Sequence, residues 1–250
     1  MTPTLSTPAL VLHTTDYSET SVIAKVFTRQ LGVRSYILKG VRKGGSRTKR
    51  NLLQPLSYLD MVVYANPKAS LNYVKEMAPH KSEPFKQSDN QAITNAVVFF
   101  MTELLYKTLR EEEPDQELFD YIVDALEQLK RPLSSRHAQM PLLFLLRLTR
   151  YLGLWPRDNY SPREPLFDLQ EGCFKSVGET TIDAATSRLL HEYLQLSTFN
   201  PQVVATDPQY PPATLAQRTA LMNRLIEYLQ LHLAGFGNFN SHEILHTILN

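Results

Sequence analysis

Cysteine and long apolar segments are nearly absent from this sequence of 250 residues. Cys173 is the single cysteine, so the chain can form no internal disulfide and cannot build a zinc site from thiolates alone. No apolar run reaches the roughly 18 residues that a membrane-spanning helix needs, and no basic leader precedes the short apolar run near the N-terminus. We therefore expect a cytoplasmic protein with neither a membrane span nor a signal peptide.

Carboxylates are missing from one long window. Between Glu19 and Asp60 there is no acidic residue, yet this basic window holds nine of the 26 lysines and arginines. The rest of the chain carries 17 basic against 25 acidic residues, so a net charge of +1 hides a strongly basic segment. Such a segment attracts polyanions. The alternative ligand is the acidic surface of a partner protein, which would make the chain an interaction adaptor.

Motifs of common enzyme classes are also missing. The glycine-rich stretch 40–46 lacks the Gly-Lys-Ser/Thr end of a phosphate-binding loop, and there is no Gly-x-Ser-x-Gly nucleophile turn. The sequence does contain His242-Glu243-x-x-His246, a spacing typical of zinc peptidases. A third ligand is needed, and none of the four residues after His246 is His, Asp or Glu. We predict no enzyme activity, no cofactor and no metal site, and keep a zinc-dependent hydrolase as the alternative.

Five segments of the first 80 residues favour β-structure. Their apolar or alternating patterns are separated by links rich in turn-forming residues. The expected strands are 9–13, 21–28, 33–39, 53–64 and 71–77. Five short strands in so short a stretch indicate a small barrel or sandwich, and a five-stranded oligonucleotide-binding (OB) barrel is one candidate.

Helical periodicity replaces the strand pattern after Pro84. Asp115 is placed to cap one helix, and Gly153 is placed to end another. The expected helices lie near 93–108, 116–129, 139–152, 183–196, 214–233 and 241–249. The helix at 139–152 is apolar on every side and should be buried.

Two segments carry a recognisable pattern, LVLHTTDYSETSVIAKVFTRQLG and YILKGVRKGGSRTKRNLLQPLSYLDMVVY. The residues that match it are Asp16, Tyr17, Glu19, Ser21, Phe27, Thr28, Gly32, Lys39, Gly40, Arg42, Ser46, Leu53, Gln54 and Pro55. This pattern resembles that of the RecO family of bacterial recombination mediators. The resemblance extends more loosely over the helical part, through LLRLTRYLGLWP and a long penultimate helix.

The resemblance implies an α+β fold with two domains. Residues 1–80 are expected to form an N-terminal five-stranded OB-type β-barrel that binds DNA. A mostly α-helical domain is expected at 81–250, with a small zinc-less hairpin insert at 157–178. Many family members carry a four-cysteine zinc element at that place, whereas this chain has only Cys173 there.

The hairpin insert must therefore be held together without zinc. Its sequence FDLQEGCF predicts two short strands with a turn at Glu171 and Gly172. We expect packing of Phe167, Leu169 and Phe174 to replace the metal.

The resemblance also implies a function in DNA repair. Members of the family bind single- and double-stranded DNA, anneal complementary strands, and with RecR help to load RecA onto DNA coated by single-stranded-DNA-binding protein. RecR and the C-terminal tail of single-stranded-DNA-binding protein are expected partners, and RecA and RecF are further candidates. A nucleoid-associated location in the cytoplasm follows.

Candidate DNA contacts lie in the basic window, because lysine and arginine on a rigid barrel displace counterions from phosphates. The expected DNA-binding residues are Arg34, Tyr36, Lys39, Arg42, Lys43, Arg47, Lys49 and Arg50. Tyr17, Tyr36 and Tyr58 are candidates for base stacking, and the alternative for each is a place in the core or rim of the barrel.

A second candidate site lies in the helical domain. Arg147, Arg150 and Trp155 are expected to receive the acidic, aromatic-ended tail of single-stranded-DNA-binding protein. The alternative is that the arginines snorkel to solvent or form ion pairs within the domain.

Overall fold

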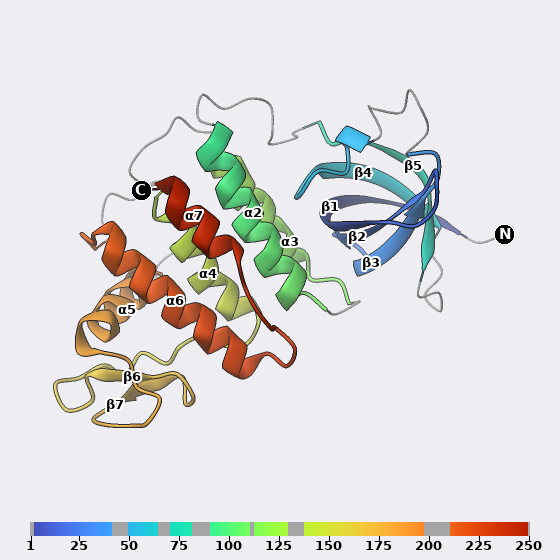
Figure 1. Ribbon diagram of the computed structural model, residues 1–250. Coiled ribbons are helices and arrows are strands. Elements are labelled where there is room, and N and C mark those ends of the chain that lie inside the picture. Colours follow the sequence, from blue (N-terminus) through green and yellow to red (C-terminus); the bar gives the residue numbers. More distant parts are fainter. Residues whose placement is uncertain are drawn as a thin grey trace. The chain divides into compact units, whose positions relative to one another are not determined.

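The computed structural model describes residues 3–41, 50–64, 71–81, 91–110, 113–129, 138–197 and 211–249. The chain divides into two compact units, Met1–Pro132 and Leu133–Asn250. In the described part of the chain, the first unit contains a five-stranded sheet and two helices, and the second contains a two-stranded hairpin and four helices (Figure 1).

The five strands of the first unit close into a barrel. Neighbouring strands follow the order β1-β2-β3-β5-β4, and all pairs are antiparallel except β3 with β5. The strands are β1 (Thr4–Asp16), β2 (Val22–Thr28), β3 (Gly32–Leu38), β4 (Tyr58–Tyr64) and β5 (Asn72–Pro79). The predicted N-terminal five-stranded barrel is therefore confirmed.

The barrel interior is packed with side chains, as expected for so few strands. Alternate residues point inward along each strand because the side-chain period of a strand is two. The buried cluster includes Ala9, Val11, Val22, Ala24, Val26, Tyr36, Leu38, Leu59, Met61 and Val63. A ligand must therefore contact the outer surface or the loops of the barrel.

The segment predicted as one strand over 53–64 is a strand only from Tyr58 onward. Residues 53–57 form turns, and Leu56 has a φ of 53°. The Leu56 N–H donates to the Val11 carbonyl at 2.8 Å, and the Val11 N–H donates to the Ser57 carbonyl at 3.2 Å. Leucine seldom adopts a positive φ. The two hydrogen bonds to β1 therefore stabilise a turn at Leu56, although the apolar residues of this segment favour a strand.

Two helices complete the first unit, α2 (Gln91–Thr108) and α3 (Gln116–Gln128). Asp115 caps α3 as predicted, because its side chain accepts a hydrogen bond from the Leu118 N–H at 2.9 Å. Phe119 of α3 packs against Phe27 of β2, with ring centroids 5.5 Å apart. The compact unit thus extends beyond the barrel, and the domain boundary at 80/81 stays a prediction.

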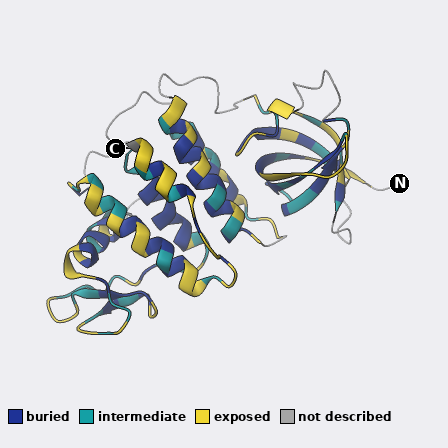
Figure 2. Cartoon of the chain, viewed as in Figure 1, coloured by how far each residue is buried: buried dark blue, intermediate teal, exposed yellow. Residues whose placement is uncertain are grey.

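The second unit is built around a buried helix, α4 (Met140–Tyr151), in which every residue from Met140 to Thr149 is buried (Figure 2). The other elements are β6 (Leu166–Asp168), β7 (Cys173–Lys175), α5 (Ala184–Ser197), α6 (Leu215–His232) and α7 (Ser241–Leu249). The predicted all-round burial of this helix is confirmed. None of the described helices is long and apolar enough to cross a membrane.

Helix α7 packs less completely than its sequence suggests. Leu245 is buried, as expected for the apolar side of the helix. Ile244 and Ile248 of the same helix are 48% and 38% exposed. Among the described apolar side chains of α7, Leu245 is the buried one.

Candidate nucleic-acid interface

Part of the basic window lies outside the described residues. Arg42, Lys43, Arg47 and Lys49 belong to that part, so their assignment to DNA stays a prediction. The other basic residues of the window lie on the barrel or directly beside it, namely Lys25, Arg29, Arg34, Lys39 and Arg50.

Two of these cations are used inside the first unit. Arg29 forms a two-pronged contact with Asp120 of α3, in which Nε and Nη2 each donate to a carboxylate oxygen at 2.8 Å. Lys25 lies over the ring of Tyr106 of α2, with Nζ 4.7 Å from the ring centroid. Burial, aided by Arg110, lowers the pKa of Lys25. The basic surface open to a ligand is therefore smaller than the sequence alone indicates.

Arg34, Lys39 and Arg50 differ in how freely they can meet a ligand. Lys39 and Arg50 are exposed, whereas Arg34 is half-buried. The Nε of Arg34 donates to the Leu31 carbonyl at 3.1 Å. Lys39 and Arg50 are thus the described cations best placed to contact phosphate.

Tyr36 was wrongly expected to contact DNA. Its side chain is completely buried in the barrel, and burial raises its pKa to about 12. Tyr58 is also buried, and its ring stacks on His80 at a centroid distance of 4.0 Å. Neither ring is available to a base, whereas Tyr17 is 59% exposed.

Sequence reasoning missed two exposed tyrosines at one end of the β4–β5 ladder. Tyr64 ends β4 and is 38% exposed, and Tyr73 near the start of β5 is 48% exposed. The Nζ of Lys39 lies 5.2 Å from the Tyr73 ring centroid. Alternation along β5 could have predicted the outward direction of Tyr73, because the next residue, Val74, packs toward the barrel core.

A groove of about 550 Å³ opens beside Lys39 on the barrel. Its walls include Lys39 and Lys75, and also the carboxylates of Asp60 and Glu76. The Lys75 ammonium lies 3.7 Å from the Glu76 carboxylate. The mixed charge makes this groove less suitable for a polyanion than the rim where Lys39 meets Tyr73.

In the second unit, the hairpin of β6 and β7 turns at Glu171 and Gly172 as predicted, and Gly172 has a φ of 66°. Phe167, Leu169 and Phe174 are all buried, and the rings of Phe167 and Phe174 meet edge to face at 5.2 Å. The predicted packing of the zinc-less hairpin is therefore confirmed.

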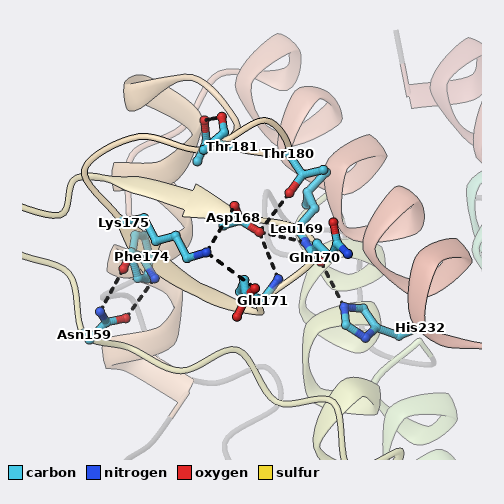
Figure 3. Close-up of polar contacts among 11 residues, drawn as sticks. Asn159, Asp168, Leu169, Gln170, Glu171, Phe174, Lys175, Thr180, Thr181 and His232 are labelled. Atoms are coloured by element: carbon cyan, nitrogen blue, oxygen red, sulfur yellow. Dashed lines mark hydrogen bonds and ion pairs between the residues drawn. The ribbon is translucent and has the colours of Figure 1, made fainter.

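Asp168 organises this hairpin from within (Figure 3). Its Oδ1 accepts hydrogen bonds from the N–H groups of Gln170 and Glu171 and from the Thr180 hydroxyl, at 2.9 to 3.0 Å. Its Oδ2 lies 3.8 Å from the Lys175 ammonium. Burial acts to raise the pKa of Asp168, but these hydrogen bonds and Lys175 together lower it. An aspartate just before a turn is the sequence feature that could have predicted this role.

Polar contacts of two further side chains, Asn159 and His232, connect the hairpin to its surroundings (Figure 3). The Asn159 side chain accepts from the Phe174 N–H at 2.8 Å and donates to the Phe174 carbonyl at 2.9 Å. His232 of α6 contacts the Leu169 carbonyl through Nε2 at 2.9 Å. The donor set does not fit a four-cysteine zinc site, since Cys173 is the one thiol and the described residues contain no cluster of three metal-ligating side chains.

The residues expected to receive a partner's tail do not share one environment. Arg147 is buried within α4, at 7% exposure, so the assignment of this residue to a partner surface is wrong. Every residue of α4 from Met140 to Thr149 is buried. The apolar sequence around Arg147 therefore contains no polar face that would have indicated an exposed site. Arg150 is exposed and Trp155 is half-buried, and their contact with a partner stays a prediction.

The His242-Glu243-x-x-His246 segment lies on α7. The His242 ring stacks on Phe239 at a centroid distance of 5.6 Å, and His246 lines a small apolar pocket with Leu142 and Leu245. Among the described residues, no third His, Cys, Asp or Glu joins these side chains in a group that could hold a metal.

Comparison with known proteins identifies one family. Residues 1–82 match the family model described as "Recombination protein O N terminal", and residues 90–190 match "Recombination protein O C terminal". A DNA repair protein RecO from Christiangramia forsetii is 30% identical over 98% of both chains. The DNA repair protein RecO of Azobacteroides pseudotrichonymphae is 25% identical, again over 98% of both. A third, from Phocaeicola vulgatus, is 33% identical over 68% of this chain and 70% of the relative.

Proposed function

Since the chain belongs to the RecO family of DNA repair proteins, we propose that it is a recombination mediator without enzymatic activity of its own. In this proposal the barrel binds single- and double-stranded DNA and anneals complementary strands at the nucleoid. With RecR it helps to load RecA onto DNA coated by single-stranded-DNA-binding protein.

The observation that carries the proposal is the basic window on an OB-type barrel. The window from Glu19 to Asp60 contains nine cations and no carboxylate, and Lys39 and Arg50 of this window are exposed. Neutralising phosphates with such cations releases condensed counterions, which favours binding and makes it sensitive to salt. Contacts of this kind position a nucleic-acid backbone without reading its sequence.

The helical part is proposed to bind the partner proteins. Arg150 is an exposed cation near the end of α4, five positions before the half-buried Trp155. An arginine beside apolar side chains suits an acidic tail with an aromatic end, such as that of single-stranded-DNA-binding protein. RecR is proposed as the second partner, and RecA and RecF as further ones.

The test is fluorescence anisotropy with a labelled single-stranded oligonucleotide over a series of salt concentrations. If about six phosphates are contacted, the logarithm of the association constant should fall against the logarithm of salt with a slope of about −4. Annealing of complementary strands coated with single-stranded-DNA-binding protein should follow the same salt dependence.

Absence of DNA binding at low salt would contradict the proposal. The basic window would then be a docking surface for an acidic protein, and the chain an interaction adaptor.

A further inference from the structure

Strand register brings three features to the same end of the barrel. Asp16 of β1 pairs with Val22 of β2, and Val22 pairs with Leu38 of β3. Tyr17 and Lys39 are the next residues after Asp16 and Leu38. Both therefore follow directly from strand ends that flank the start of β2 on its two sides.

Tyr73 joins this end through the parallel pairing of β3 with β5. Ile37 pairs with Tyr73, two residues before Lys39, and the Lys39 ammonium lies 5.2 Å from the Tyr73 ring centroid. Tyr17 is 59% exposed and Tyr73 is 48% exposed. Lys39 is also exposed, so a cation and two open aromatic rings occur at one rim of the barrel.

The pair formed by Lys39 and Tyr73 differs from the other lysine–tyrosine pair of the unit. Lys25 and Tyr106 join β2 to α2, and Lys25 is partly desolvated there. Lys39 follows β3 and Tyr73 lies on β5, and the parallel ladder between these strands is limited to two residue pairs. An exposed aromatic ring beside an exposed cation offers a face for stacking and a charge for phosphate.

We infer that Tyr73 stacks on an unpaired base of DNA while Lys39 contacts the adjacent phosphate, with Tyr17 as a second stacking surface at the same rim. This inference rests on the proposed function and assigns its strand preference. Stacking on a tyrosine needs an unstacked base, which a single strand presents and an intact duplex does not. The Tyr73 rim therefore binds single strands.

The charges around the rim set the side on which the strand runs. Asp60 and Glu76 line the groove beside Lys39, and their carboxylates repel phosphate. Lys75 in the same groove is already 3.7 Å from Glu76. The strand passes over the Lys39 and Tyr73 rim toward Tyr17 and stays out of the groove.

The test compares Tyr73→Leu with Tyr73→Phe by fluorescence anisotropy on three labelled probes. The probes are an oligothymidine, an oligonucleotide of equal length with abasic sites, and a duplex. Tyr73→Leu should weaken binding of oligothymidine by about tenfold, since one stacked base contributes about that factor. It should leave the abasic and duplex probes unchanged, and Tyr73→Phe should behave as wild type because the ring is kept.

Two further variants separate stacking from charge and from folding. Lys39→Gln should weaken both single-stranded probes, oligothymidine and the abasic oligonucleotide, and reduce the salt slope on single strands by about 0.7, the value for one phosphate. Tyr106→Leu removes the matched tyrosine of the Lys25 pair and should bind oligothymidine as wild type does. Thermal melting of each variant verifies that it is folded.

The possible results distinguish the inference from the proposed function. The stacking site is wrong, and the proposed function stands, if wild type binds oligothymidine and Tyr73→Leu binds it with the same affinity. The same conclusion holds if Tyr73→Leu loses as much affinity for the abasic probe as for oligothymidine. If wild type binds none of the probes, the proposed function itself fails.

Discussion

At the scale of single residues, Asp168 shows how a carboxylate can hold a small hairpin together. It is 3% exposed, yet it satisfies two backbone N–H groups and one hydroxyl and lies beside Lys175. A buried carboxylate is stabilising only when such partners compensate for lost hydration. Asp168 therefore links the turn between β6 and β7 to Thr180 and Lys175.

Replacing Asp168 tests this role. Asp168→Ala should lower the free energy of unfolding by about 1–3 kcal/mol, because buried donors lose their acceptor. Chemical denaturation followed by circular dichroism measures the change. Glu171→Gln is the matched control, since Glu171 is exposed and only its carboxylate, 3.6 Å from Lys175, changes. A loss no larger than that of the control would contradict the role of Asp168.

The same variant should change the dependence of stability on pH. The pKa of Asp168 is lowered in the folded protein relative to about 3.9 in an unfolded chain. Its ionised form therefore stabilises the fold fully above about pH 4 and ceases to do so as the pH falls through the folded pKa. The difference in stability between wild type and Asp168→Ala should shrink below about pH 4. A difference that stays constant to pH 2 would show that ionisation of Asp168 contributes nothing.

At the scale of elements, two glycines lie at chain turns, Gly153 after α4 and Gly172 between β6 and β7, in the same backbone conformation but in different surroundings. Gly153 follows α4 with a φ of 69°, and its N–H and that of Leu154 donate to the Arg150 and Thr149 carbonyls. A Cβ at Gly153 would meet no atom within 4 Å. A Cβ at Gly172 would lie 2.7 Å from the Tyr228 hydroxyl.

This pair gives a prediction in which one variant is the control for the other. Gly153→Ala should cost about 1 kcal/mol, the strain of alanine in a left-handed conformation. Gly172→Ala should cost about 1 kcal/mol more, because the buried Tyr228 ring must also move. Equal losses, measured by denaturation, would mean that the hairpin adjusts without resisting the Tyr228 contact.

The sequence predicted some features of the helices and strands well and others poorly. Asp115 and Gly153 mark helix ends through local chemistry, so both were predictable. Leu56 was not, because hydrogen bonds of its turn with Val11 depend on tertiary structure. Tyr36 could not be assigned to one face of β3, since Val33 and Ile37 on the other face are buried too and a strand buried on both sides has no informative alternation.

At the scale of the whole molecule, charge is unevenly distributed along a nearly neutral chain. Nine cations fall in a window without carboxylates. The sequence predicted this window and its OB-type barrel, but it could not show that Arg29 and Lys25 are engaged by α3 and α2. Those contacts join residues about 80 or more positions apart in the sequence, and no local pattern reveals them.

The central claim is that the basic window of the barrel is the DNA-binding surface. The most direct measurement is the affinity of Arg42→Glu/Lys43→Glu for a labelled single strand at low salt, beside Arg188→Glu/Arg224→Glu. The control makes the same change of net charge on α5 and α6, where each arginine pairs with a glutamate of its own helix. We predict that the first variant loses binding by at least about a hundredfold, since each reversed charge removes one phosphate contact and adds a repulsion, while the control stays near wild type. Equal affinity of the two variants would contradict the claim.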